Sequence, residues 1–196
     1  IILLRSSEID VRQRAFAALQ DMAEEGGSDS RMTVKMAGGI DRFVAIMKDG
    51  SLEAQEYALW LLWQSTDMSS KKAIATARSA VPIIVILNSD KLSQLAKEHA
   101  ATVLAGMTSA DLVSVDETAR ATNKADIIEG GGIMPLVKLL KTGVKGAKKY
   151  AALTLAQLCR SAEGATNETQ NAIAGVGAIP ALVEWLDHPN LGPPPM

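Results

Sequence analysis

The chain has 196 residues, a mass of 20.7 kDa, a net charge of −2 and a pI of about 5.7. This balance argues against a general nucleic-acid binder, which needs a surplus of basic residues. A single cysteine, Cys159, excludes a disulfide framework and a zinc cluster, and it fits a reducing, intracellular compartment. The longest apolar run, residues 80–87, is far shorter than the ~20 residues that span a bilayer, so we expect no transmembrane segment.

Helical apolar spacing runs through almost the whole chain, and turn formers divide it into units of similar length. The units are residues 1–31 (partial), 32–69, 70–122, 123–168 and 169–187 (partial), followed by a proline-rich tail at 188–196. Both ends fall inside a unit and the first residue is not Met. We therefore interpret the chain as part of a longer protein, with any targeting peptide hidden.

An alanine four residues before a leucine recurs along the chain. These alanines are Ala15, Ala58, Ala100 and Ala151, at intervals of 43, 42 and 51 residues. A helical period of about 42 is typical of HEAT- or armadillo-type solenoids, in which each unit buries its apolar face against its neighbours. The longer third interval reflects a polar insertion at residues 109–122, which is either a contact or an exposed loop.

Each of the three later alanines is preceded by a helix that opens with an apolar pentad, and a fourth pentad follows them. The pentads are residues 40–44, 81–85, 133–137 and 179–183. Prolines fall in the first turn of three of these helices, where a missing N–H is harmless. Ahead of most pentads, a short helical segment ends in glycine, which predicts a sharp corner.

The phrases NKADIIEGGGIMPLVKLL at 123–140 and QNAIAGVGAIPALVEWL at 170–186 carry this pattern, and residues 34–40 hold a third copy. They resemble the signature of the armadillo-repeat family, and the resemblance covers nearly the whole chain. It implies an all-α, right-handed solenoid of about four armadillo repeats, partial at both ends. It also implies a non-catalytic scaffold that binds an extended peptide segment or a neighbouring subunit along the groove of its third helices, within a larger assembly.

On those third helices, positions two before and two, six and nine after each recurring alanine share one stripe. In the nuclear-import receptor branch of the family, the second and sixth positions are repeatedly Trp and Asn. Trp60 matches once and Gln64 stands where Asn is expected, so an importin-alpha-like adaptor for basic peptides is the alternative function. Trp60 either faces the groove or packs between repeats, and we expect Trp63 to pack. The candidate groove residues are Gln13, Asp21, Glu24, Glu56, Trp60, Gln64, Asp67, Glu98, Thr102, Lys149, Gln157 and Arg160.

Acidic residues dominate the first half of this stripe and basic residues the last. We hypothesise that a partner segment with basic and acidic ends, or a neighbouring subunit, lies along it, against the alternative of a solvated surface. The lysines within residues 136–149 either meet an acidic partner or form a solvated helix end. His99 and His188 stand apart from any nucleophile or metal partner, and the glycines at 130–132 lack the rest of a phosphate loop. The sequence therefore predicts no enzyme, no metal and no cofactor.

Overall fold

The computed structural model describes residues 3, 6, 8, 11, 14, 15, 18, 21, 39–64, 74, 77–109, 117–160 and 167–186. Within these residues the regular secondary structure is helical, with no strand. The helices are α3 (Gly39–Asp49), α4 (Leu52–Gln64), α6 (Ala80–Asn88), α7 (Gln94–Thr108), α8 (Glu117–Glu129), α9 (Ile133–Thr142), α10 (Lys145–Cys159), α11 (Asn167–Gly175) and α12 (Ala178–Leu186).

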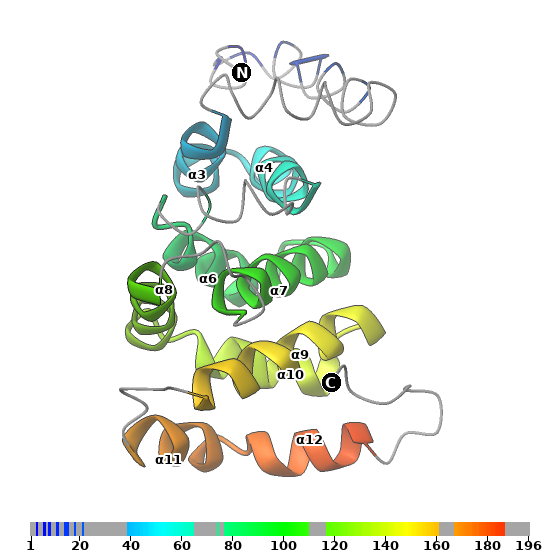
Figure 1. Ribbon diagram of the computed structural model, residues 1–196. Helices are drawn as coiled ribbons and strands as arrows, with labels where there is room; N and C mark the ends of the chain where they lie inside the picture. Colours follow the sequence, from blue (N-terminus) through cyan, green and yellow to red (C-terminus); the bar gives the residue numbers. More distant parts are fainter. Residues whose placement is uncertain are drawn as a thin grey trace.

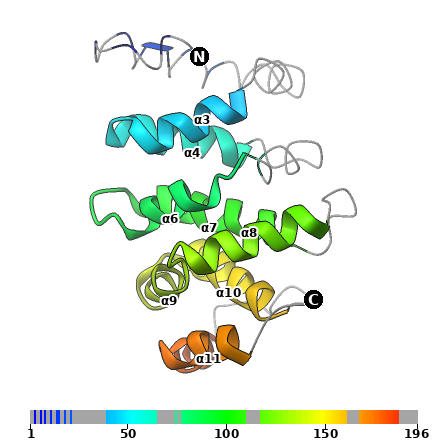
Figure 2. The ribbon, with the colours of Figure 1, turned by 90° about the vertical axis from the view of Figure 1, so that its left-hand side faces the viewer.

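The helices are stacked in layers, from α3 and α4 at one end of the described part to α11 and α12 at the other (Figure 1). The second helices of successive repeats, α3, α6, α9 and α12, pack on one another, and so do the third helices α4, α7 and α10. The first helix α8 packs against α6 and α7 and runs across the stack (Figure 2). This arrangement confirms the predicted all-α solenoid.

The recurring alanines mark where the third helices approach their neighbours. Ala58, Ala100 and Ala151 each have 0% of their surface exposed. The distance between packed helices depends on the side chains at their contact, and a one-carbon side chain lets a neighbouring helix come close. The spacing of these alanines in the sequence is therefore the spacing at which successive third helices pack on their neighbours.

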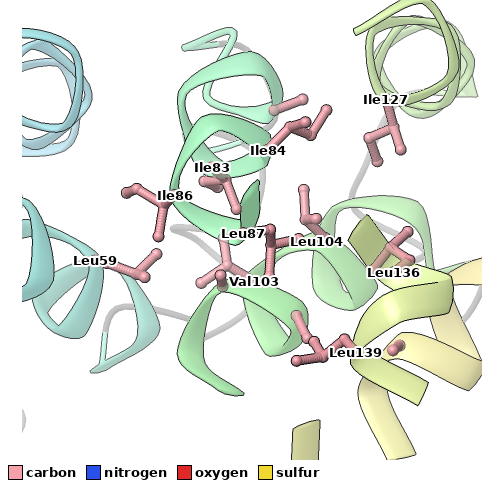
Figure 3. Close-up of a cluster of buried hydrophobic side chains, with 14 of the residues drawn as sticks. Leu59, Ile83, Ile84, Ile86, Leu87, Val103, Leu104, Ile127, Leu136 and Leu139 are labelled. Atoms are coloured by element: carbon pink, nitrogen blue, oxygen red, sulfur yellow. The ribbon is translucent and has the colours of Figure 1, made fainter. Parts of the chain in front are cut away.

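The core is continuous from one layer to the next rather than confined to one repeat. Leu59 of α4, Ile83 of α6 and Leu104 of α7 lie close together in its middle, and Ile127 of α8 and Leu136 of α9 extend it (Figure 3). Each of these five side chains is fully buried. A single repeat could not bury them, because their partners come from other repeats.

The apolar pentads are out of register in two of the four second helices. The buried residues at the start of these helices are Ile40, Ala80, Ile133 and Ala178. The next residue is exposed in the three helices that have a proline after it: Val81 (47%), Met134 (61%) and Ile179 (58%). The predicted pentads at 81–85 and 179–183 are therefore wrong by one residue, and each of those two helices buries the alanine before them.

The glycines between α8 and α9 form a Schellman motif, which ends α8. The N–H of Gly132 donates to the carbonyl oxygen of Ile127 at 2.8 Å, and that of Gly131 donates to Ile128 at 3.0 Å. Gly131 has φ +74°, the left-handed conformation that this double closure requires, and Gly177 has φ +78° at the next corner. The corner confirms the turn predicted from the glycines.

The first helix of the third complete repeat is longer than expected. It begins at Glu117, whereas the sequence pattern placed the repeat boundary between residues 122 and 123. Residues 117–122 are therefore helical rather than part of an inserted loop. The remainder of that insertion, residues 110–116, lies outside the described residues, as do most of residues 1–31 and all of the tail at 188–196.

Candidate binding face on the third helices

An open hollow of about 220 Å³ lies between α4 and α7, on the face that the third helices form. Its walls are Glu56, Tyr57 and Trp60 from α4 and Ser93, Leu95, Ala96 and His99 from α7. Trp60 is half-buried against the core, and Leu95 is 60% exposed. Trp60 thus combines both expected roles, because it packs on the core and presents surface to the hollow.

His99, which lines this hollow, also forms an aromatic contact with Trp63. Their rings are stacked, with centroids 4.5 Å apart and planes inclined by 22°. His99 is 6% exposed, and its burial lowers its pKa, an effect that the Glu56 carboxylate partly opposes. The imidazole is therefore neutral near pH 7 and serves as an apolar wall. As expected, Trp63 packs between repeats, whereas the sequence pattern left His99 without a role.

Glu56 connects the two third helices that flank the hollow. Its Oε1 accepts a hydrogen bond of 2.6 Å from the backbone N–H of Ser93, the N-cap residue of α7. The Ser93 hydroxyl in turn accepts from the N–H of Ala96 at 3.1 Å. A carboxylate at a helix N-terminus is favoured by the unpaired N–H groups and the helix dipole. This acid of the groove is thus engaged by the protein itself.

The same position is used again one repeat further on. Glu98, two residues before Ala100 as Glu56 is before Ala58, has its carboxylate directly against Gly146 in the first turn of α10. In α10 this position holds Lys149, which is exposed and lies with its Nζ 5.4 Å from the centroid of the Tyr150 ring. The change from acidic to basic along the stripe therefore coincides with the last described third helix.

Thr102 and Gln157 satisfy their polar atoms within the solenoid. The Thr102 hydroxyl donates to the backbone carbonyl of Glu98 at 2.9 Å, within its own helix. Gln157 is only 9% exposed, and its Oε1 accepts a hydrogen bond of 2.6 Å from the hydroxyl of Thr108. The expectation that Gln157 lines an open groove is wrong, because its side chain is buried against α7.

The structure describes three of the remaining six candidates. Arg160 is exposed after the end of α10, and its backbone carbonyl accepts from Lys124 Nζ at 2.5 Å. Gln64 is half-buried at the end of α4, and Asp21 is exposed on a helical segment. The last three candidates lie outside the described residues: Gln13, Glu24 and Asp67.

The lysine-rich segment at 136–149 covers the corner between α9 and α10. Lys138 forms an ion pair with Asp90 at 2.8 Å, and its hydrogen bond and charge lower the pKa of that carboxyl. Both side chains are mostly exposed, so this pair contributes little to stability. One lysine of the cluster is thus already paired across two repeats.

The described part of the chain contains neither a candidate metal site nor a candidate membrane-spanning helix. It contains no group of three or more His, Cys, Asp or Glu side chains that could hold a metal ion. Burial raises the pKa of the Cys159 thiol, which makes it less reactive. In the same residues, no helix combines the length and the apolar character needed to cross a bilayer.

Comparison with known proteins gives the fold a name. No protein-family model and no curated protein sequence matches the chain. Computationally designed armadillo repeat proteins for modular peptide recognition align with a TM-score of 0.72 and 21% identity, over 96% of this chain and 74% of theirs. An engineered protein aligns with a TM-score of 0.72 and 26% sequence identity, over 97% of this chain and 43% of its own. A designed armadillo repeat protein in complex with the peptide (KR)4 aligns with a TM-score of 0.51 and 21% sequence identity. The alignment covers 96% of this chain and 91% of the designed protein.

These likenesses define an α-solenoid of the armadillo class. The chain has an armadillo-like repeat fold, in which α8, α9 and α10 form one complete set of first, second and third helices.

Proposed function

We propose that the chain is a non-catalytic scaffold that binds an extended segment of a partner protein across α4, α7 and α10, as one component of a larger assembly. The hollow beside Trp60 carries this proposal. Partly exposed aromatic side chains around a hollow are the usual anchors of protein interfaces. The designed proteins of this fold that recognise peptides support the proposal by analogy.

The importin-alpha-like alternative draws on Trp60 alone. Its pattern would need Trp again two residues after the other recurring alanines, where α7 has Thr102 and α10 has Leu153. The acids that would attract a basic peptide, Glu56 and Glu98, already contact the next helix. These observations favour a general segment-binding scaffold over an adaptor for basic peptides.

Selection from a displayed library of random peptides tests the proposal. We expect the protein to enrich a related set of sequences, whose affinity falls at least about tenfold in Trp60→Ala, as for interface hot spots. Met134→Ala is the matched control, because Met134 is exposed on α9, away from the hollow. A library that yields no more enrichment than an unrelated helical protein would contradict the proposal.

The peptide (KR)4, titrated in parallel at physiological salt, separates the two functions. The adaptor alternative requires (KR)4 to bind as well as the selected peptides do, and to lose affinity in Trp60→Ala. The proposed scaffold function predicts that (KR)4 binds weakly and that added salt abolishes this binding, because its contacts are screened charges.

A further inference from the structure

We infer that the hollow between α4 and α7 receives one aromatic side chain of the partner segment. This inference rests on the proposed function and names the chemistry of its anchor. The hollow of about 220 Å³ exceeds the ~150 Å³ of an apolar protein cavity that binds benzene, so it has room for a ring-sized group.

The walls favour a ring over a cation. Tyr57, Trp60 and His99 supply aromatic surface, and Leu95 and Ala96 complete an apolar wall. His99 is stacked on Trp63 and buried, which keeps it neutral. Aromatic rings pair edge-to-face or offset with such walls and gain energy beyond the area that they bury.

The single acid of the hollow is already engaged. Oε1 of Glu56 accepts the N–H of Ser93, and the carboxylate lies at the positive end of the α7 dipole. A cationic side chain would have to give up hydration against the apolar walls, and Ser93 leaves it only the second oxygen of Glu56 as a partner. A ring needs only the apolar walls, and it leaves the Glu56–Ser93 hydrogen bond intact.

Among the described third helices, the next step does not repeat the residues that form this hollow. Counted from Ala100 and Ala151, the step between α7 and α10 has Thr102 in place of Trp60 and Gly146 in place of Leu95. There the Glu98 carboxylate lies against Gly146, on the surface that a larger residue would cover. The partner is therefore anchored by one side chain at one step, and not by the same side chain repeated along the array.

Titration with amino-acid amides tests the inference without knowledge of the partner. The probes are N-acetyl-tryptophanamide, N-acetyl-leucinamide and N-acetyl-argininamide, added at millimolar concentration while the indole N–H signals of the ¹⁵N-labelled protein are recorded. We expect the tryptophan amide to bind about fivefold more tightly than the arginine amide and to shift the Trp60 signal most.

Two variants and two controls link any binding to the hollow. Trp60→Ala should abolish the preference for the aromatic probe. Leu95→Gln should weaken it about threefold without disturbing the core, because Leu95 is 60% exposed. Met134→Ala and Ile179→Ala, which truncate exposed side chains on α9 and α12, should leave the affinities unchanged.

Three outcomes would overturn the inference: equal or tighter binding of the arginine amide, no binding of any probe, or aromatic binding that survives both Trp60→Ala and Leu95→Gln. A different result would refute the proposed function. Random peptides that are never enriched would refute it even where the tryptophan amide binds. Enriched peptides without an aromatic residue at a shared position would refute only the anchor.

Discussion

The Glu56 carboxylate on α4 accepts a 2.6 Å hydrogen bond from the backbone N–H of Ser93, the N-cap residue of α7. The residue that the sequence marks as an acidic contact for a partner thus connects two neighbouring repeats. Charge reversal at Glu56 would therefore change the stability of the solenoid as well as any binding.

Glu56→Ala should lower the free energy of unfolding by about 1–2 kcal/mol, because it removes a charge-assisted hydrogen bond from a helix N-terminus. Urea denaturation followed by far-ultraviolet circular dichroism measures this change. Glu184→Ala, which removes an exposed acid from α12, is the control and should change the value by less than about 0.5 kcal/mol. Equal effects of the two substitutions would show that Glu56 does not connect the repeats.

The Thr108–Gln157 hydrogen bond should couple α7 to α10. Thr108→Val leaves the buried Oε1 of Gln157 unpaired and should cost about 1–3 kcal/mol. Gln157→Leu in the same background should recover part of that loss, because it removes the unpaired group. A double-mutant cycle measured by thermal unfolding would give the coupling energy, and additive effects would refute a direct interaction.

Asn123 offers a stabilising substitution. The side chain on α8 is 0% exposed, and neither its Oδ1 nor its Nδ2 has a hydrogen-bond partner. Asn123→Leu removes two unsatisfied polar atoms while it keeps the number and branching of the side-chain heavy atoms, and it should raise the stability by about 1–2 kcal/mol. Asn123→Asp keeps the shape but adds a charge, so its melting temperature should fall. A lower melting temperature for the leucine variant would indicate that the amide has a partner in solution.

His99 should make the solenoid less stable in mild acid. Burial depresses its pKa below the usual 6.5, so the unfolded chain takes up a proton at higher pH than the folded protein does. The contribution of the neutral imidazole is thus complete above about pH 6.5 and is lost as the pH falls below it. Urea midpoints at pH 7.5 and 5.5 should differ less in His99→Phe, which keeps a ring against Trp63, than in the natural sequence. An NMR titration that places His99 at or above 6.5 would contradict this account.

The repeat period could be predicted from the sequence because the recurring alanines form the helix contacts. Ala58, Ala100 and Ala151 are buried as their spacing requires. The register of the second helices could not be predicted as well. Ala80 and Val81 are both apolar, so hydrophobicity alone does not tell which of the two faces the core. The start of α8 was missed because its first six residues contain no large apolar side chain and show no apolar period.

The sequence pattern located residues of the candidate site correctly, but it did not show what their side chains contact. The stripe on the third helices includes Glu56 and Trp60, which do line the hollow. Glu56 and Glu98 contact the next helix through packing between neighbouring repeats, which leaves no local signal in the sequence. The same holds for the stacking of Trp63 on His99, whose partners come from different repeats.

The contacts made by Glu56 and Glu98 both run in one direction, from a third helix to the beginning of the next. Surfaces that differ in this way join head to tail, so they generate an open array rather than a closed pair. A tandem duplication of one such block would therefore lengthen the face by one interhelical spacing, roughly 10 Å, without any new kind of contact. Chains of this design can gain reach through gene duplication alone.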